Sequence, residues 1–238
     1  MVCPCVKTTA DTEEPMQQHI VGVGQFATIH NINNKTARKI PSDKSYTYSV
    51  EAVEIEAKIY KHLGKHKRIA KCIRCSNDYI DLRYEPNGNL ETYLADKPVS
   101  AQWRYRLARQ AIEAVVYIHK MHVIQSDLSA RQFLFLPRDK ESSNTVQSDL
   151  FALGSTIHEI LIGRKPYDGV EDEEVQRLYS NREFPTLEDI ESAHWRKAIL
   201  KCWKTEYESA SEILEDLPAV PLPTRIFLNL QLALRWLK

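Results

Sequence analysis

A single acidic residue, Asp127, lies in a short polar loop where a long amphipathic stretch gives way to an apolar run. The loop has the sequence Gln-Ser-Asp-Leu-Ser-Ala-Arg-Gln over residues 125–132, and the apolar run Phe133–Leu136 follows it. A carboxylate in such a loop can accept the proton of a hydroxyl group that attacks a phosphoryl group. It can equally cap the backbone of a turn. The residue type alone therefore leaves a catalytic and a structural role open.

The first 85 residues predict a five-stranded antiparallel sheet with one helix. Alternating apolar and polar residues, turn residues and a proline stop predict strands at 19–24, 26–32, 36–40, 68–73 and 79–84. Residues 50–63 have helical spacing, because Val53, Ala57, Tyr60 and Leu63 share one face and Gly64 follows.

After a turn at 86–88 the sequence becomes helical. The periodicity predicts helices over 103–121, 149–162, 171–179, 193–203, 209–217 and 225–237. The segment 149–162 is apolar nearly all round, which predicts a central buried helix. Helices that follow a run of strands predict an α+β fold.

Bulk composition excludes several classes of protein. Lys and Arg together number 32, as do Asp and Glu, so charge gives no reason to expect a nucleic-acid partner. No apolar run reaches the roughly 20 residues that span a bilayer, and the N-terminus lacks the features of a signal peptide. We therefore expect a monomeric protein of the cytoplasm, with the nucleus as an alternative.

Five cysteines without secretory features indicate reduced thiols. Cys72 and Cys75 form a Cys-x-x-Cys pair, but a structural zinc site needs four ligands and no second pair is near. We expect no zinc site there, and the two residues are interpreted as small side chains at the end of a strand.

Three short motifs appear in a fixed order: Asn-Gly-Asn-Leu at 87–90, Asp-Leu-Ser-Ala-Arg at 127–131 and Ser-Asp-Leu-Phe-Ala-Leu-Gly at 148–154. Their order and spacing resemble those of the eukaryotic protein kinases over about residues 18–217. The motifs look most like those of fungal protein kinase-like domain proteins. The resemblance implies a bilobal fold, ATP binding, phosphate transfer to protein hydroxyls and a protein substrate or partner.

By this resemblance the chain divides into four parts. Residues 1–17 are expected to be a disordered tail, residues 18–85 the N-terminal lobe with the sheet, residues 86–221 the helical C-terminal lobe and residues 222–238 a final helix. The activation segment inside the second lobe is shortened.

The resemblance also assigns a Gly-rich loop to the turn that contains Gly22, Val23, Gly24, Phe26 and Ala27. In kinases this loop covers the nucleotide phosphates, because glycines let backbone N–H groups approach closely. Ala27 stands at the third glycine position, which is tolerable only with a negative φ. An ordinary hairpin turn is the alternative.

Five further residues would complete the ATP site. Lys39 resembles the lysine that contacts the phosphates, and Glu56 resembles its helix partner. Arg83, Tyr84 and Glu85 occupy the position of the hinge that binds adenine through backbone groups. Two exposed charges of opposite sign are the alternative for Lys39 and Glu56, since such pairs contribute little.

The catalytic loop departs from the family pattern. Asp127 keeps the proton-acceptor position, but Gln125 and Ser126 replace the usual His and Arg. Gln132 replaces the metal-ligating Asn, and its extra methylene suits the strict geometry of Mg²⁺ poorly. Asp149 resembles the helix-start Asp that hydrogen-bonds the loop backbone.

The sequence contains neither Asp-Phe-Gly, whose Asp holds Mg²⁺ in kinases, nor Ala-Pro-Glu. Asp139 is the nearby Asp, but it lies too close to the loop to be a good substitute. Removal of a hairpin would leave backbone groups without partners, so we expect an open segment over 137–147.

Three hypotheses follow: a pseudokinase that binds ATP or acts as a scaffold, an active kinase whose sequence here lacks an internal segment, and a divergent active enzyme. The small kinase subunit of the tRNA-modifying KEOPS complex is a weaker alternative, because the loop motif and the neutral charge do not favour it.

Overall fold

The structure is a computed structural model that describes residues 19–126, Leu128 and residues 145–219. Its first part is the predicted five-stranded antiparallel sheet, with strand order β1-β2-β3-β5-β4. The strands are β1 (His19–Val23), β2 (Ala27–Asn31), β3 (Thr36–Pro41), β4 (Cys72–Cys75) and β5 (Ile80–Arg83). The predicted tail at 1–17 and the last helix at 225–237 lie outside the described residues.

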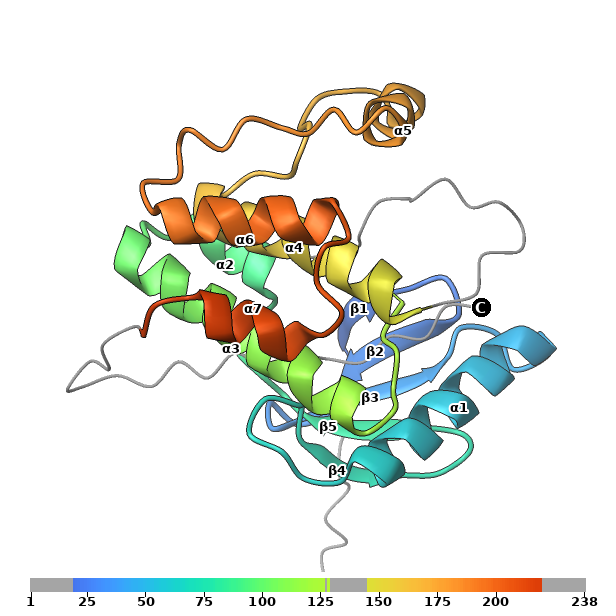
Figure 1. The fold of residues 1–238 in the computed structure, drawn as a ribbon. Helices are drawn as coiled ribbons and strands as arrows, with labels where there is room; N and C mark the ends of the chain where they lie inside the picture. Colours follow the sequence, from blue (N-terminus) through green and yellow to red (C-terminus); the bar gives the residue numbers. More distant parts are fainter. Residues whose placement is uncertain (1–18, 127, 129–144, 220–238) are drawn as a thin grey trace, which may run out of the picture.

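One helix, α1 (Thr47–Leu63), covers a face of this sheet (Figure 1). The four residues of its predicted apolar stripe, from Val53 to Leu63, are all buried. They pack with Ile80 of β5 and Ile69 into one apolar cluster. The sheet and α1 therefore form a layer pair with its own core.

The strand predicted at 68–73 was placed too early, because β4 covers Cys72–Cys75. Arg68 instead turns toward the helical half, where its guanidinium group donates to Glu113 Oε2 at 2.8 Å and to Gln110 Oε1 at 2.6 Å. These tertiary contacts outweigh the local strand pattern.

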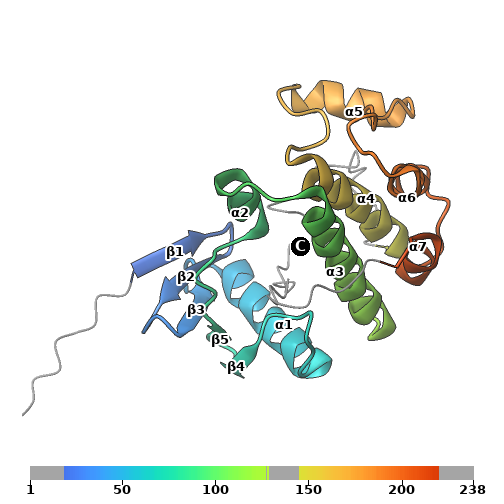
Figure 2. The same cartoon turned by 90° about the vertical axis from the view of Figure 1, so that its left-hand side faces the viewer.

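Six helices follow: α2 (Leu90–Asp96), α3 (Ala101–Lys120), α4 (Val146–Ile162), α5 (Asp172–Ser180), α6 (Ala193–Trp203) and α7 (Ala210–Asp216). The sequence analysis missed α2, which begins where the Asn89 side chain accepts a hydrogen bond from the Thr92 N–H at 2.8 Å. Figure 2 shows these helices beside the sheet half, with α3 nearest to it among the long helices.

The helix predicted at 149–162 begins three residues earlier than expected. Thr145 and Ser148 form a capping box, in which each side chain bonds the other residue's backbone. Residues 145–147 therefore form a helix cap and first turn, and their inclusion in the expected open segment was wrong. The rest of that segment, 137–144, lies outside the described residues.

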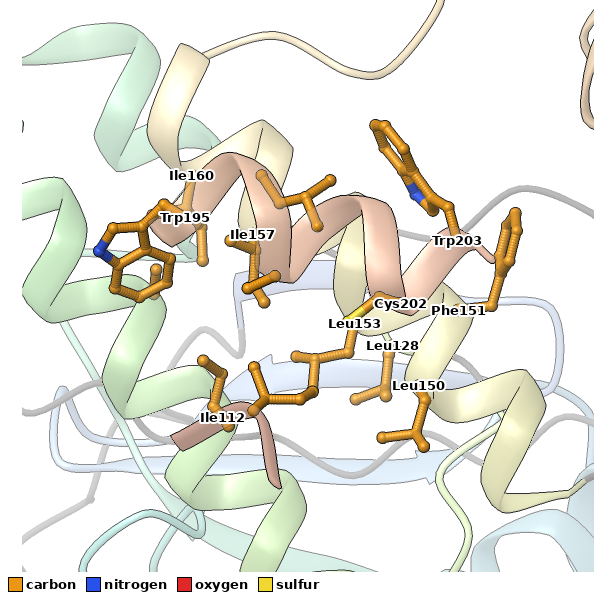
Figure 3. Close-up of a cluster of buried hydrophobic side chains, with 14 of the residues drawn as sticks. Ile112, Leu128, Leu150, Phe151, Leu153, Ile157, Ile160, Trp195, Cys202 and Trp203 are labelled. Carbon is orange, nitrogen blue, oxygen red and sulfur yellow. The ribbon is translucent and has the colours of Figure 1, made fainter. Parts of the chain in front are cut away.

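The core of the helical half surrounds α4, as predicted from its apolar sequence. Leu150, Leu153, Ile157 and Ile160 are fully buried and pack against α3 and α6 (Figure 3). Gly154 lets α4 approach α6 closely, since a Cβ there would lie 2.6 Å from the Cys202 Cβ.

The two halves join at the end of α3. Ile118 of α3 is buried in the apolar cluster of the sheet half, and the Tyr117 ring stacks on His66 at a centroid distance of 3.7 Å. The predicted α+β, bilobal kinase-like fold with a sheet lobe and a helical lobe is confirmed. Within the described residues, no helix is long and apolar enough to cross a membrane.

Candidate functional site

Lys39 and Glu56 form a buried ion pair between β3 and α1. The strand register sets Lys39 opposite Ile29 of β2 and Ile80 of β5, and both neighbours are apolar. Glu56 lies on the sheet-facing side of α1, and both charged side chains are almost fully buried. The alternative of two separate surface charges is therefore wrong.

The Gly-containing turn joins β1 to β2, and Ile29 of β2 lies between Gly22 of β1 and Lys39 of β3 in the sheet. Gly22 is opposite Ile29 in the β1–β2 register, as Lys39 is in the β2–β3 register. The turn is closed by a hydrogen bond from the Gly24 N–H to the Ala27 carbonyl oxygen at 2.8 Å. Ala27 is buried and has no positive φ, so the condition for replacing a third glycine is met.

Phe26 is held at the same turn through its backbone, because its carbonyl oxygen accepts from the Ser42 N–H at 3.0 Å. Val23, by contrast, is 74 % exposed at the end of β1. Backbone hydrogen bonds therefore hold the base of the turn, while the Val23 side chain at the end of β1 is exposed to solvent.

The three predicted hinge residues follow β5 directly. Arg83 and Glu85 pair with each other at 2.6 Å, and each side chain is 48 % exposed. The Tyr84 N–H donates to the Lys35 carbonyl oxygen at 2.9 Å, and the Gly88 N–H donates to the Glu85 carbonyl oxygen at 3.1 Å. The Arg83–Glu85 pair is a surface pair, and the segment connects the two lobes.

Asp149 fixes the start of the loop that leads to position 127. Its carboxylate accepts hydrogen bonds from the backbone N–H groups of Gln125 and Ser126, each at 2.8 Å. It also lies 2.9 Å from His119 Nε2. The prediction that Asp149 bonds the loop backbone is confirmed.

Both neighbours of position 127 are constrained. Ser126 has a φ of 61°, a left-handed conformation that costs energy for a residue with a Cβ. Leu128 is buried among the core residues of the helical lobe (Figure 3). Asp127 itself lies outside the described residues, as do Gln132 and Asp139.

The sequence analysis missed two residues that make long-range contacts, His119 with Asp149 and Arg68 with α3. His119 is in the last turn of α3, and its contact with Asp149 spans 30 residues. The sequence signal for His119 was the position of a titratable side chain one helical turn before the polar loop. Nothing local marks Arg68, whose partners on α3 lie more than 40 residues away.

No group of three or more His, Cys, Asp or Glu side chains is placed to hold a metal ion in the part of the chain that the structure describes. The candidate site residues that the structure describes belong to the Lys39–Glu56 pair, the Gly-containing turn, the segment 83–85 and the loop bonded by Asp149.

Residues 16–140 and 137–215 match the protein tyrosine and serine/threonine kinase family. The chain belongs to this family. A probable serine/threonine-protein kinase of Dictyostelium discoideum is 20 % identical over an alignment 236 residues long. This alignment covers 78 % of this chain and 18 % of the relative. The melanoma receptor tyrosine-protein kinase of Xiphophorus maculatus is 22 % identical over 251 residues, covering 84 % of this chain and 21 % of the relative.

This chain thus spans about a fifth of the length of these curated relatives. Both alignments are longer than the part of this 238-residue chain that they cover, so each relative has residues within the aligned region that this chain lacks. The family match is divided into two stretches that meet at 137–140.

Proposed function

We propose that this member of the kinase family binds ATP but transfers phosphate poorly, and that it acts mainly as a pseudokinase. The observation that carries the proposal is the buried Lys39–Glu56 ion pair beside the Gly-containing turn. A buried ion pair offsets its desolvation cost only in part, and apolar residues of similar size often give equal stability. Stability alone is thus a weak reason for this arrangement, whereas phosphate binding requires it.

In this proposal the Lys39 ammonium group contacts the phosphates and Glu56 holds it in place. Backbone N–H groups of the turn from Gly22 to Ala27 approach the phosphate oxygens. Backbone groups of residues 83–85 bind the adenine. All three parts come from the sheet lobe and the segment that follows it.

Weak phosphate transfer is inferred from what the sequence lacks. Asp127 can accept a proton, but Gln132 stands at the metal-ligating position and no Asp-Phe-Gly follows. Loss of one preorganised charge-stabilising group typically lowers the rate by about 10²–10³. Since the residues at hand suit Mg²⁺ poorly, we expect nucleotide binding that does not depend on this ion. In this proposal the protein is a monomer that binds a protein partner in the cytoplasm or the nucleus.

An active kinase with an omitted internal segment is the second candidate. The division of the family match at 137–140 and the extra residues of both relatives favour it. The test is the sequence of the genomic locus and transcript. Coding sequence for an Asp-Phe-Gly hairpin between Leu136 and Asn144 would replace the pseudokinase proposal with this one.

The pseudokinase proposal is tested by thermal unfolding with ATP, in EDTA and in Mg²⁺. At an ATP concentration of 100 times Kd, binding should raise the Tm by roughly 5–10 °C in both buffers. The double variant Lys39→Met/Glu56→Gln removes both charges together, so it should keep its fold and lose the shift. Lys58→Met, on the exposed side of α1, is the matched control and should keep the shift.

Two results would contradict the proposal. The absence of any shift with ATP, ADP or AMP would mean that the site binds no adenine nucleotide. A shift that requires Mg²⁺, together with autophosphorylation that Asp127→Asn abolishes, would identify a divergent active kinase.

A further inference from the structure

Cys72 and Cys75 lie on the same face of β4, although residues three apart in a regular strand face opposite sides. A β-bulge between Cys72 and Arg74 causes this, because Cys72 is opposite Leu82 and Cys75 is opposite Ile80. Leu82 and Ile80 are two residues apart and therefore share a face. Both cysteines accordingly pack against the apolar cluster under α1.

The two cysteine residues also line a groove, and the Cys75 thiol donates to the Ala57 carbonyl oxygen of α1 at 3.7 Å. A groove of about 430 Å³ runs between the end of α1 and β4 and is lined by both cysteines. Its other lining residues include the basic side chains of Lys61, Lys65, His66, Lys67, Lys71 and Arg74, whereas no acidic residue lines it within the described part of the chain. Each cysteine is partly exposed, while Cys202 is buried.

We propose that Cys72 and Cys75 form a two-thiolate binding site for a soft monovalent ion of the Cu(I) class. Soft thiolate ligands select such ions. Binding replaces two S–H protons by two metal–sulfur bonds, so that one Cu(I) and two thiols give one bis-thiolate complex with a charge of minus one and two protons. The surrounding basic residues stabilise this anionic complex.

Strand geometry leaves room for a bridging ion between the two cysteines. Positions opposite Leu82 and Ile80 are separated by about 7 Å along an extended strand, at the upper limit of the Cα separation that a disulfide allows. A zinc–thiolate bond is about 2.3 Å long, so two bonds to an ion of similar size span about twice the length of an S–S bond. The ion can thus join the thiols without displacing β4.

The test uses the full chain with Cys3→Ser and Cys5→Ser, which leaves three cysteines. Under anaerobic conditions, Cu(I) is titrated in competition with a chromophoric Cu(I) chelator, and native mass spectrometry counts bound ions. We expect one Cu(I) per chain, with sulfur as its X-ray absorption ligands. Cys72→Ser and Cys75→Ser should each weaken binding by more than about 100-fold, since each removes a ligand rather than an outer-shell partner.

Two controls make the outcome decisive. Cys202→Ser should bind Cu(I) like the parent, because this thiol is buried in the helical core. Lys61→Gln should weaken binding a few-fold and make it less dependent on salt. Unchanged binding in Cys72→Ser and Cys75→Ser, with circular dichroism showing folded protein, would overturn the proposal. So would a Cys72–Cys75 disulfide as the stable form in a metal-free glutathione buffer.

Discussion

The two lobes bury charge in different ways. In the sheet lobe, the Lys39 ammonium group meets the Glu56 carboxylate, and both ends of the interaction are charged side chains from separate elements. In the helical lobe, Asp149 accepts bonds from two backbone N–H groups and contacts His119. The first arrangement joins a strand to a helix through two charged side chains, whereas the second fixes the shape of a loop. The comparison shows that a buried charge can connect two elements in one lobe and order the backbone of a loop in the other.

The largest effect is expected from removal of the Asp149 carboxylate. Asp149→Ala leaves two backbone N–H groups without an acceptor in a buried place, at a cost of roughly 1–3 kcal/mol each. We expect the free energy of unfolding, measured with urea, to fall by about 4 kcal/mol. Asp168→Ala, on an exposed turn, is the control and should change it little. A loss below about 1 kcal/mol would show that the loop needs no such support.

A smaller effect is expected in the sheet lobe. Lys39→Met leaves the Glu56 carboxylate buried without its cation, and breaking a buried pair from one side typically costs 3–5 kcal/mol. We expect a loss of about 3 kcal/mol, because Lys39 retains slight exposure. The double variant Lys39→Met/Glu56→Gln should recover at least half of this loss in the same urea experiment. Equal losses in both variants would mean that the pair contributes to stability as a pair, which would weaken the functional interpretation.

The third prediction concerns the helical lobe alone, where α4 packs closely on α6 at Gly154. Gly154→Ala would set a Cβ 2.6 Å from that of Cys202, and overpacking of a core usually costs about 1–3 kcal/mol. Alanine also improves the helix by about 1 kcal/mol, so we expect a net loss of about 2 kcal/mol at most. Thermal unfolding should show it as a Tm lower by about 4–8 °C. An unchanged Tm would indicate that the two helices can separate at little cost.

Acid should affect the helical lobe through His158 on α4. Burial lowers the pKa of this imidazole to about 4 from an ordinary value of 6.5. The unfolded chain therefore binds the proton at a higher pH than the folded chain does, and the free energy of unfolding falls as pH drops from 6.5 to 4. We expect His158 to account for a loss of about 1–2 kcal/mol between pH 7 and pH 5.

The check is the pH dependence of urea unfolding in the parent and in His158→Phe. The variant keeps an aromatic ring near Trp203 and should lose less stability over this range. His66 in the sheet lobe also has a pKa lowered by burial, so some dependence should remain. Identical profiles for both proteins would exclude His158 as the responsible group.

Much of the fold follows from local patterns. The stripe from Val53 to Leu63 predicted which face of α1 is buried, and the apolar sequence of α4 predicted its central place. Errors arose where short polar signals mattered. The side chain of Asn89 begins α2 and the Thr145–Ser148 capping box begins α4, and both signals are only a few residues long.

The family motifs predicted Lys39, Glu56 and Asp149, and the structure brings the first two together and bonds the third to its loop. Asp127 and Gln132 stay predictions. No local signal could have predicted that Cys72 and Cys75 share a face, because a bulge in β4 decides it through pairing with β5.

The sequence by itself determined the types and order of the strands and of the longer helices, together with the motif residues between them, since helix and strand periodicity depends on neighbours in the chain. Tertiary structure alone decided that Lys39 meets Glu56, that Arg68 joins α3 and that two thiols line one groove. These contacts link residues on different elements or depend on strand register. They form only when burial of the shared apolar clusters offsets the entropy of bringing distant segments together.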